Sequence, residues 1–204
     1  MKNSKTPISK MKINFYLILI FNLIFISKAF AQTDSTKKTV VGLSTQIYPA
    51  GLIATIHTEL FYNKNTSLFF RAGGNFADRK DFSPFNDNEK GNGFGGSAGY
   101  RKYINLKKGN ILLGSNLDVW NMWIDWKNNI GQPNQTQGRT YTLVLQPWLE
   151  AGYFISVNKS PIEIGITTGF GREINVITNG KPVGQGWIGS VSLVVQFARF
   201  KQRD

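Results

Sequence analysis

The chain has 204 residues, a formal net charge of +12 and no cysteine, so disulfides, thiolate metal sites and cysteine nucleophiles are excluded. Aromatic residues make up 13% of the chain and charged residues only 18%, a composition that excludes an intrinsically disordered protein. The length suits one domain of ordinary size.

The first 31 residues have the pattern of a secretory signal peptide. Four lysines precede an apolar stretch at 13–26, and Ala29-Phe30-Ala31 then forms a small-x-small cleavage site before Gln32. A membrane anchor is the alternative, but 13–26 would rise only about 21 Å as a helix, short of the roughly 30 Å hydrocarbon core. We therefore expect a cleaved signal peptide at 1–31 and a single domain at 32–204.

After residue 32, eight segments alternate between apolar and polar residues, which is the period of a β-strand. No apolar run there is long enough to cross a bilayer as a helix. Pro147 cannot donate a ladder hydrogen bond and predicts a bulge or a local break. The segments lie at 39–48, 54–62, 68–76, 93–103, 111–119, 141–153, 162–170 and 187–197.

Eight amphipathic strands can close into a barrel with the apolar face inward, as in a soluble lipocalin-like protein, or outward, as in a transmembrane barrel. The polar face favours the outward arrangement, because it consists of Gly, Ser, Thr, Asn and Gln with isolated charges, whereas a water-facing surface is far more charged. Aromatic residues at the ends of the apolar faces match interfacial girdles. The predicted lumenal polar cluster comprises His57, Glu59, Arg71, Arg101, Asp118, Glu150 and Glu163.

The connections also differ between the two ends of the predicted barrel. If the mature amino terminus is periplasmic, the periplasmic turns are short and three of the four external connections are long, as in bacterial outer-membrane barrels. The expected periplasmic turns are 63–65, 105–110 and 157–160, and the expected external connections are 49–51, 77–92, 126–138 and 175–185.

From Thr39 to Phe200 the chain resembles the small eight-stranded outer-membrane β-barrel proteins of Gram-negative bacteria, the OmpA-like or porin-like barrel domains. The resemblance is carried by 93–103 (GFGGSAGYRKY), 147–153 (PWLEAGY) and 191–200. It implies an antiparallel up-and-down transmembrane barrel, surrounded by outer-membrane lipid and assembled by the barrel-insertion machinery. The family's last strand ends on an aromatic residue, whereas here Phe200 is followed by 201–204.

Catalytic chemistry has little support in the sequence. His57 is the only histidine, which excludes a multi-histidine metal site. Pairing across the 63–65 turn places Arg71 opposite His57 or, after a two-residue shift, opposite Glu59. This predicts a buried Glu-Arg-His cluster that stiffens the lumen, with a proton-linked gate or a hydrolytic base as the functional alternative. We predict no catalytic, metal-binding or cofactor-binding residues.

Two further patterns are given structural interpretations. The glycines of 93–96 lack the residues of a phosphate-binding loop, and they are expected to make room for bulky lumenal neighbours. The acidic residues of 77–92 lack the spacing of an EF-hand and are interleaved with cations, which indicates a solvated loop rather than a calcium site. These are Asp78, Asp81, Asp87 and Glu89, with Arg79, Lys80 and Lys90 between or beside them.

Many basic residues fall at the expected periplasmic rim, where anionic phospholipid headgroups are a better partner than nucleic acid. They are Lys37, Lys38, Lys64, Lys102, Lys107, Lys108, Lys159, Arg199, Lys201 and Arg203.

Two functions and a third, weaker one remain after these exclusions. The leading hypothesis is a non-enzymatic outer-membrane barrel with an envelope-structural role or a surface-interaction role through loops 77–92 and 126–138. A narrow channel or transport accessory is the alternative, and a soluble periplasmic lipocalin-like, lipid-binding barrel is a weaker one.

Overall fold

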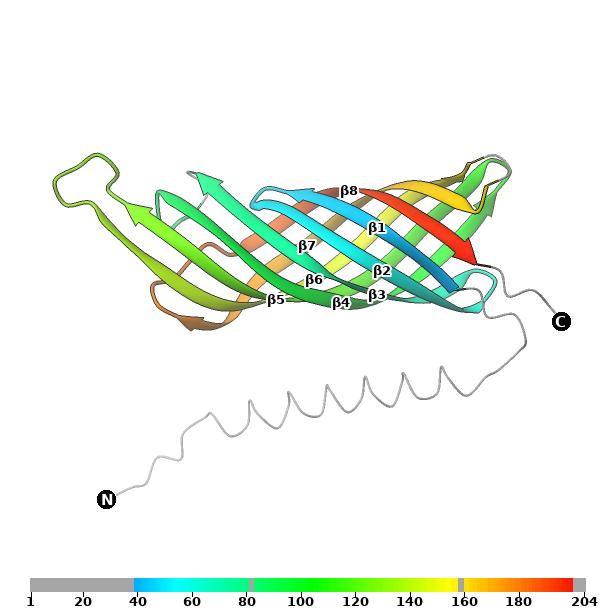
Figure 1. Cartoon of the computed structure of the whole chain (residues 1–204), viewed down its shortest axis with the longest axis horizontal. Helices are drawn as coiled ribbons and strands as arrows, with labels where there is room; N and C mark the ends of the chain where they lie inside the picture. The colour runs from blue at the N-terminus through cyan, green and yellow to red at the C-terminus, as the bar shows by residue number, and fades with distance from the viewer. Residues whose placement is uncertain (1–38, 81–82, 158–159, 200–204) are drawn as a thin grey trace, which may run out of the picture. The chain divides into compact units, whose positions relative to one another are not determined.

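Eight antiparallel strands form a closed barrel in the computed structural model, which describes residues 39–80, 83–157 and 160–199 (Figure 1). Each strand pairs with the next along the chain, and the first pairs with the last. Within these residues no helix is long and apolar enough to cross a bilayer. The predicted up-and-down barrel is confirmed, while the predicted signal peptide at 1–31 lies outside the described residues. The strands are β1 (Thr39–Tyr48), β2 (Gly51–Asn63), β3 (Thr66–Lys80), β4 (Asn88–Leu106), β5 (Gly109–Asn128), β6 (Thr136–Ser156), β7 (Ile162–Asn179) and β8 (Gly186–Arg199).

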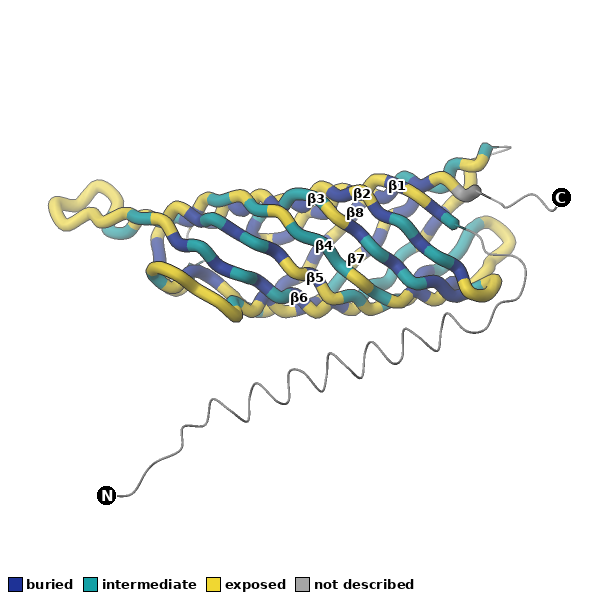
Figure 2. Tube along the Cα trace, turned by 60° about the horizontal axis from the view of Figure 1, so that its bottom comes forward, coloured by how far each residue is buried: buried dark blue, intermediate teal, exposed yellow. Residues whose placement is uncertain are grey.

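Buried and exposed positions alternate along the strands (Figure 2). Polar residues such as Gln46, Arg71 and Asp118 are buried, whereas Leu149 is 68% exposed and Ile166 is 61% exposed. Because side chains of one strand point alternately to the two faces of a sheet, the apolar set must face outward. The predicted inside-out arrangement is therefore confirmed.

The two ends of the barrel differ in their connections, and we name them by these. The turn end carries the connections β2–β3, β4–β5 and β6–β7, of which the first two lie at 64–65 and 107–108. The loop end carries the tight β1–β2 turn and the connections β3–β4, β5–β6 and β7–β8.

The strands are longer and the loops shorter than the sequence predicted. Strands β4 to β7 contain 18 to 21 residues, against the roughly ten expected of a tilted membrane crossing. The connections predicted at 77–92, 126–138 and 175–185 shrink to 81–87, 129–135 and 180–185. The prediction of long loops was wrong because strand pairing continues past the apolar band, where polar residues on both faces conceal the period of two.

Pro147 interrupts the ladder on one side only. On the β5 side, Leu117 pairs with Pro147 without a shift of register. On the β7 side, paired residues stop at Leu145 and resume at Trp148, and the register shifts between Leu143 and Val144. The predicted local break is confirmed, because proline has no N–H to donate to the neighbouring strand.

Candidate functional site: the barrel lumen

Two clusters of buried apolar side chains lie toward the two ends of the lumen, and buried ion pairs occupy other levels of it. Tyr103 belongs to the apolar cluster nearer the turn end, and Trp120 belongs to the one nearer the loop end. The turn-end cluster is Val40, Phe61, Tyr103, Leu112, Phe154 and Val194. The loop-end cluster is Tyr48, Ala50, Ile53, Ala77, Trp120, Met122, Ile124, Val144, Trp148, Val183 and Ile188.

Arg101 is the centre of the charged network in the turn-end half of the lumen. Its guanidinium donates to Glu59 Oε1 at 2.5 Å and to both oxygens of Glu150 at 2.9 Å, and it lies 3.5 Å from the centroid of the Phe69 ring. The Tyr103 hydroxyl also donates to Glu59, at 2.8 Å. These charges are removed from water and neutralised by each other, which is what burial of ions requires.

This network corrects the predicted partner of Glu59. The β2–β3 register places His57 opposite Arg71, which was the first of the two predicted alignments. Arg71, however, bonds to neither His57 nor Glu59, because its guanidinium reaches across the lumen to Asp118 at 2.6 Å. The carboxylate of Glu59 is instead paired with Arg101 from β4.

Arg71 and Asp118 organise the middle of the lumen. Arg71 also donates to Gln46 Oε1 and Ser97 Oγ, both at 2.7 Å, and the indole N–H of Trp148 donates to Asp118 at 3.0 Å. Five strands, β1, β3, β4, β5 and β6, are thus joined through one buried ion pair. An arginine with its donors shared among several acceptors is held rigidly, because each bond constrains the same planar group.

His57 lies beside these networks without joining an ion pair. Its Nε2 is 3.4 Å from Gln196 Oε1, its ring centroid is 5.6 Å from that of Phe69, and Nδ1 has no hydrogen-bond partner within the described residues. Gln196 in turn donates to the half-buried Glu163 at 2.8 Å. All seven residues of the predicted lumenal cluster therefore point inward, but they divide between separate networks.

A third ion-pair network, near the loop end, escaped the sequence analysis. Arg79 donates to Glu89 at 3.0 Å and also to Glu173, and all three residues are buried. Arg79 and Glu89 had been interpreted as parts of a solvated loop, which is wrong for both. Their positions continue the inward alternation of β3 and β4, and that spacing is the signal that could have identified them. The loop interpretation suits Asp78, which is exposed and pairs with Lys90.

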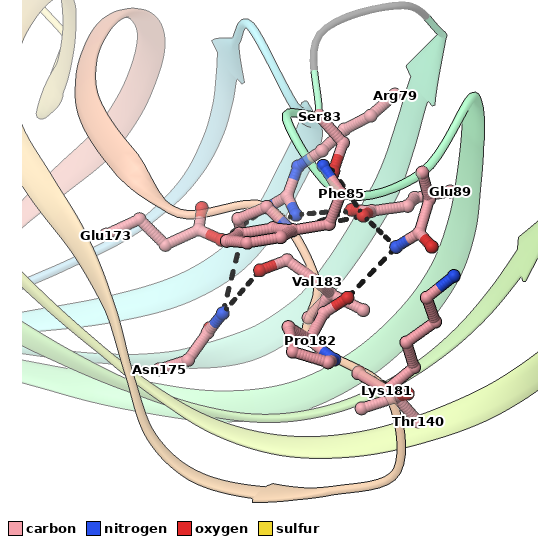
Figure 3. Close-up of polar contacts among 12 residues, drawn as sticks. Arg79, Ser83, Phe85, Glu89, Thr140, Glu173, Asn175, Lys181, Pro182 and Val183 are labelled. Carbon is pink, nitrogen blue, oxygen red and sulfur yellow. Dashed lines mark hydrogen bonds and ion pairs between the residues drawn. The ribbon is translucent and has the colours of Figure 1, made fainter.

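The β7–β8 connection, 180–185, folds into the loop end of the barrel and closes it (Figure 3). Gly184 donates its N–H to Glu89 at 3.1 Å and accepts from Arg79 at 2.9 Å through its carbonyl. Val183 is 1% exposed and belongs to the loop-end apolar cluster. We call the segment 180–185 the inward loop.

Further bonds hold the inward loop to elements around the barrel. Asn86 donates to the carbonyl of Pro182 at 3.0 Å, and the Thr140 hydroxyl donates to the carbonyl of Lys181 at 2.8 Å (Figure 3). The Lys181 ammonium lies 4.7 Å from the centroid of the Trp126 ring. The inward loop is therefore anchored to the β3–β4 connection, β5 and β6 in addition to Arg79 and Glu89.

Two gaps lie among the described lumenal residues. A gap in the middle of the lumen holds about 10 Å³, roughly enough for the centre of one water molecule. It lies between Arg71 and Trp148 on one side and the small residues Ser190 and Ser192 on the other. A second gap of about 130 Å³ opens beside the inward loop, between Pro49, Glu173 and Ile188.

Several lumenal positions require glycine because a large ring lies against them. A Cβ added at Gly95 would lie 2.7 Å from the Trp120 ring, and one at Gly165 would lie 2.4 Å from the Phe154 ring. The prediction that these glycines make room for bulky neighbours is confirmed at Gly95.

The acidic and histidine side chains can also be compared with the geometry of a metal site. In the part of the chain that the structure describes, no three His, Cys, Asp or Glu side chains converge to hold a metal ion. The described carboxylates of the lumen are engaged by arginine, amide or hydroxyl donors.

The basic rim can be located only in part. Lys64, Lys102, Lys107 and Lys108 are exposed at the turn end. Lys37, Lys38, Lys159, Lys201 and Arg203 lie outside the described residues, and only the backbone of Arg199 is described.

An apolar exterior around a charged and filled interior defines a transmembrane β-barrel of the smallest common size. No protein-family model and no curated protein sequence matches the chain.

Solved structures similar to this chain include three bacterial barrels. Neisserial surface protein A matches with a TM-score of 0.45 and 11% identity over 79% of this chain and 96% of that one. The attachment invasion locus protein Ail of Yersinia pestis matches with a TM-score of 0.42 and 10% identity, over 82% and 100%. The N-terminal β-barrel domain of Pseudomonas aeruginosa OprF matches with a TM-score of 0.41 and 9% identity, over 78% and 97%.

Proposed function

We propose that residues 32–204, after removal of the signal peptide, form a non-enzymatic outer-membrane barrel with a closed lumen and an envelope-structural or surface-interaction role. The single observation that carries the proposal is the inside-out arrangement, in which the exterior is apolar while buried ion pairs fill the interior. Outer-membrane lipid and the barrel-insertion machinery are the partners that this role requires.

The exterior supports insertion into lipid. Large apolar side chains are exposed on the exterior of all eight strands, among them Leu43, Ile56 and Leu149, a surface that would aggregate in water. Because the first strand pairs with the last in the β1–β8 ladder, the sheet closes on itself, as the hydrocarbon region demands.

The interior supports a closed lumen. Three ion-pair networks occupy successive levels, apolar clusters lie toward both ends, and the inward loop covers the loop end. The gap between Arg71 and Trp148 admits about one water molecule, which supports a lumen without a continuous path for solutes.

The loop end is the natural place for contact with a surface partner. The β5–β6 hairpin projects farther than the other loop-end connections (Figure 1), and Ile130 in its connection is 52% exposed. The connections 81–87 and 129–135 also bond to each other, because Asp87 accepts from the Ile130 amide. The expected binding segments 77–92 and 126–138 would therefore act as one surface.

Gel mobility of the membrane-extracted protein tests this proposal, since a closed barrel in detergent migrates differently before and after boiling. We expect salt-resistant membrane association and a mobility shift. Recovery in the soluble fraction without a shift would instead favour the lipocalin-like alternative. Planar-bilayer recordings complete the test: we expect no stable conductance steps, whereas defined steps would support the channel alternative.

A further inference from the structure

The exterior of β3 to β6 changes from aromatic to charged over successive rows toward the loop end. Residues in one row face each other across the ladders, so their side chains are neighbours on the same surface. The first row contains Phe76, Asn92, Trp123 and Tyr141, the next contains Asp78, Lys90, Asp125 and Arg139, and the last contains Lys80, Asn88, Lys127 and Gln137.

The middle row is made of two ion pairs. Lys90 lies 3.1 Å from Asp78, and Arg139 lies 2.8 Å from Asp125, with all four side chains more than half exposed. Each pair orders its cation at the surface without removing it from solvent. Exposed pairs of this kind contribute little to stability.

The outermost row contributes two cations that pair with no carboxylate of the described residues. Lys80 and Lys127 are exposed, and neither has a carboxylate oxygen within 4.0 Å among the described residues. The nearby Asp87 accepts instead from the Ile130 amide at 3.3 Å. We call Lys80, Lys90, Lys127 and Arg139 the basic patch.

The basic patch does not lie at one height above the membrane. With strands tilted by about 40° and spaced about 4.8 Å apart, a row perpendicular to the strands changes height by about 3 Å per strand, or about 9 Å from β3 to β6. The β5–β6 hairpin projects farthest at the loop end (Figure 1), so the row rises toward β6. Its cations therefore stand at several levels above the aromatic row.

We propose that the basic patch binds the headgroup of a glycolipid that carries several phosphates, in the leaflet at the loop end. A headgroup with one phosphate presents its charge at a single depth, whereas these cations are spread over several. Lys80 and Lys127 are the principal contacts because no described carboxylate pairs with them, while Lys90 and Arg139 add donors that Asp78 and Asp125 hold in place. This inference rests on the proposed membrane function, since it needs a lipid leaflet around the barrel.

Lipid retention by the folded full-length protein in neutral detergent tests the proposal. The probes are purified lipopolysaccharide with a phosphorylated core and the same material after enzymatic dephosphorylation, with bound lipid counted by native mass spectrometry. We expect preferential binding of the phosphorylated form. A Lys80→Gln/Lys127→Gln variant should bind it about 25-fold more weakly, at about fivefold per lysine, while the matched Lys107→Gln/Lys108→Gln variant at the turn end should bind normally.

Three results would overturn the assignment: equal binding of both probes, equal loss of affinity in both double variants, or displacement of the lipid by millimolar inorganic phosphate. The mobility shift on boiling is recorded for each sample, and it separates the two proposals. If the wild-type protein shows the mobility shift but binds the phosphorylated and dephosphorylated lipids equally, only the proposal for the basic patch is contradicted. A wild-type protein without the shift contradicts the membrane barrel itself.

Discussion

The amide N–H of Gly184 donates to both carboxylate oxygens of Glu89 at 3.1 Å, although the two residues are 95 positions apart in the chain. Through this contact the backbone of the inward loop is hydrogen-bonded to the buried Arg79–Glu89 pair. The closed state of the loop end therefore depends on a small set of bonds that substitutions can test separately from the barrel ladders.

Replacing Val183 with aspartate should release the inward loop. The side chain would place a charge within the loop-end apolar cluster, and loss of its burial, about 1.5–3 kcal/mol, makes the open loop about 10-fold to 100-fold more populated. A broad-specificity protease should then cleave 180–185 that much faster, while the mobility shift on boiling persists. Ile130→Asp, at an exposed position, is the control and should leave the cleavage rate of 180–185 unchanged. Equal rates for Val183→Asp and wild type would mean that the loop is not held by this contact.

Replacing Arg101 with methionine should strongly destabilise the barrel. Glu59 and Glu150 would lose their shared cation inside the lumen, at an expected cost of about 3–5 kcal/mol in the free energy of unfolding. Urea unfolding of the refolded protein in lipid vesicles measures this. Arg139→Met removes an arginine from an exposed pair and should cost only about 0–1 kcal/mol. Similar losses in the two variants would contradict a buried, dry network around Arg101.

Replacing Gly165 with alanine should overpack the turn-end cluster. The new Cβ would approach the Phe154 ring to 2.4 Å, which predicts a loss of about 1–3 kcal/mol. Combining it with Phe154→Leu should cost less than the sum of the single changes, because the smaller side chain relieves the clash. Gly189→Ala serves as the control, since a Cβ there meets nothing closer than 3.9 Å. If the two losses in unfolding free energy were strictly additive, the Phe154 ring would not clash with the new Cβ, because it moves away freely.

Replacing Leu149 with arginine should disfavour the membrane-inserted state. Leu149 is 68% exposed on the exterior of β6, between Tyr141 and Tyr153, and a cation at the bilayer midplane of a barrel costs about 2–4 kcal/mol. The unfolding free energy in vesicles should fall by this amount. Ile130→Arg, in the β5–β6 connection, should change it by no more than about 0.5 kcal/mol. If both variants behaved alike, Leu149 would not face lipid.

The strand order and the inward and outward faces could be predicted because lipid and lumen select opposite chemistry at alternate positions. Leu43, Leu149 and Ile166 face outward, as the alternation along their strands indicated, and His57 and Asp118 face inward. Which face a residue points to depends only on whether it sits at an odd or an even position in its strand. The shear of the barrel does not enter, so a single sequence is sufficient to assign the two faces.

The partners inside the lumen could not be predicted in the same way. Arg101 on β4 reaches Glu59 on β2, two strands away, and Arg71 on β3 reaches Asp118 on β5. Such contacts cross the barrel interior, so they depend on its shear and diameter rather than on the register of adjacent strands. Arg79 and Glu89 were missed for a different reason, because their strands continue beyond the apolar band that marks a crossing.

Pairing between β1 and β8 has a consequence for assembly. Thr39 lies opposite Arg199, so the seam that closes the barrel joins the first and last described residues of the fold. Until β8 is in place, β1 and β7 each present a row of backbone donors and acceptors with no partner, which the hydrocarbon core does not tolerate. Seven strands are therefore not a stable stopping point in lipid. The chain must enter the bilayer as a nearly complete barrel, and a break at either end of the seam should impair insertion rather than produce a smaller barrel.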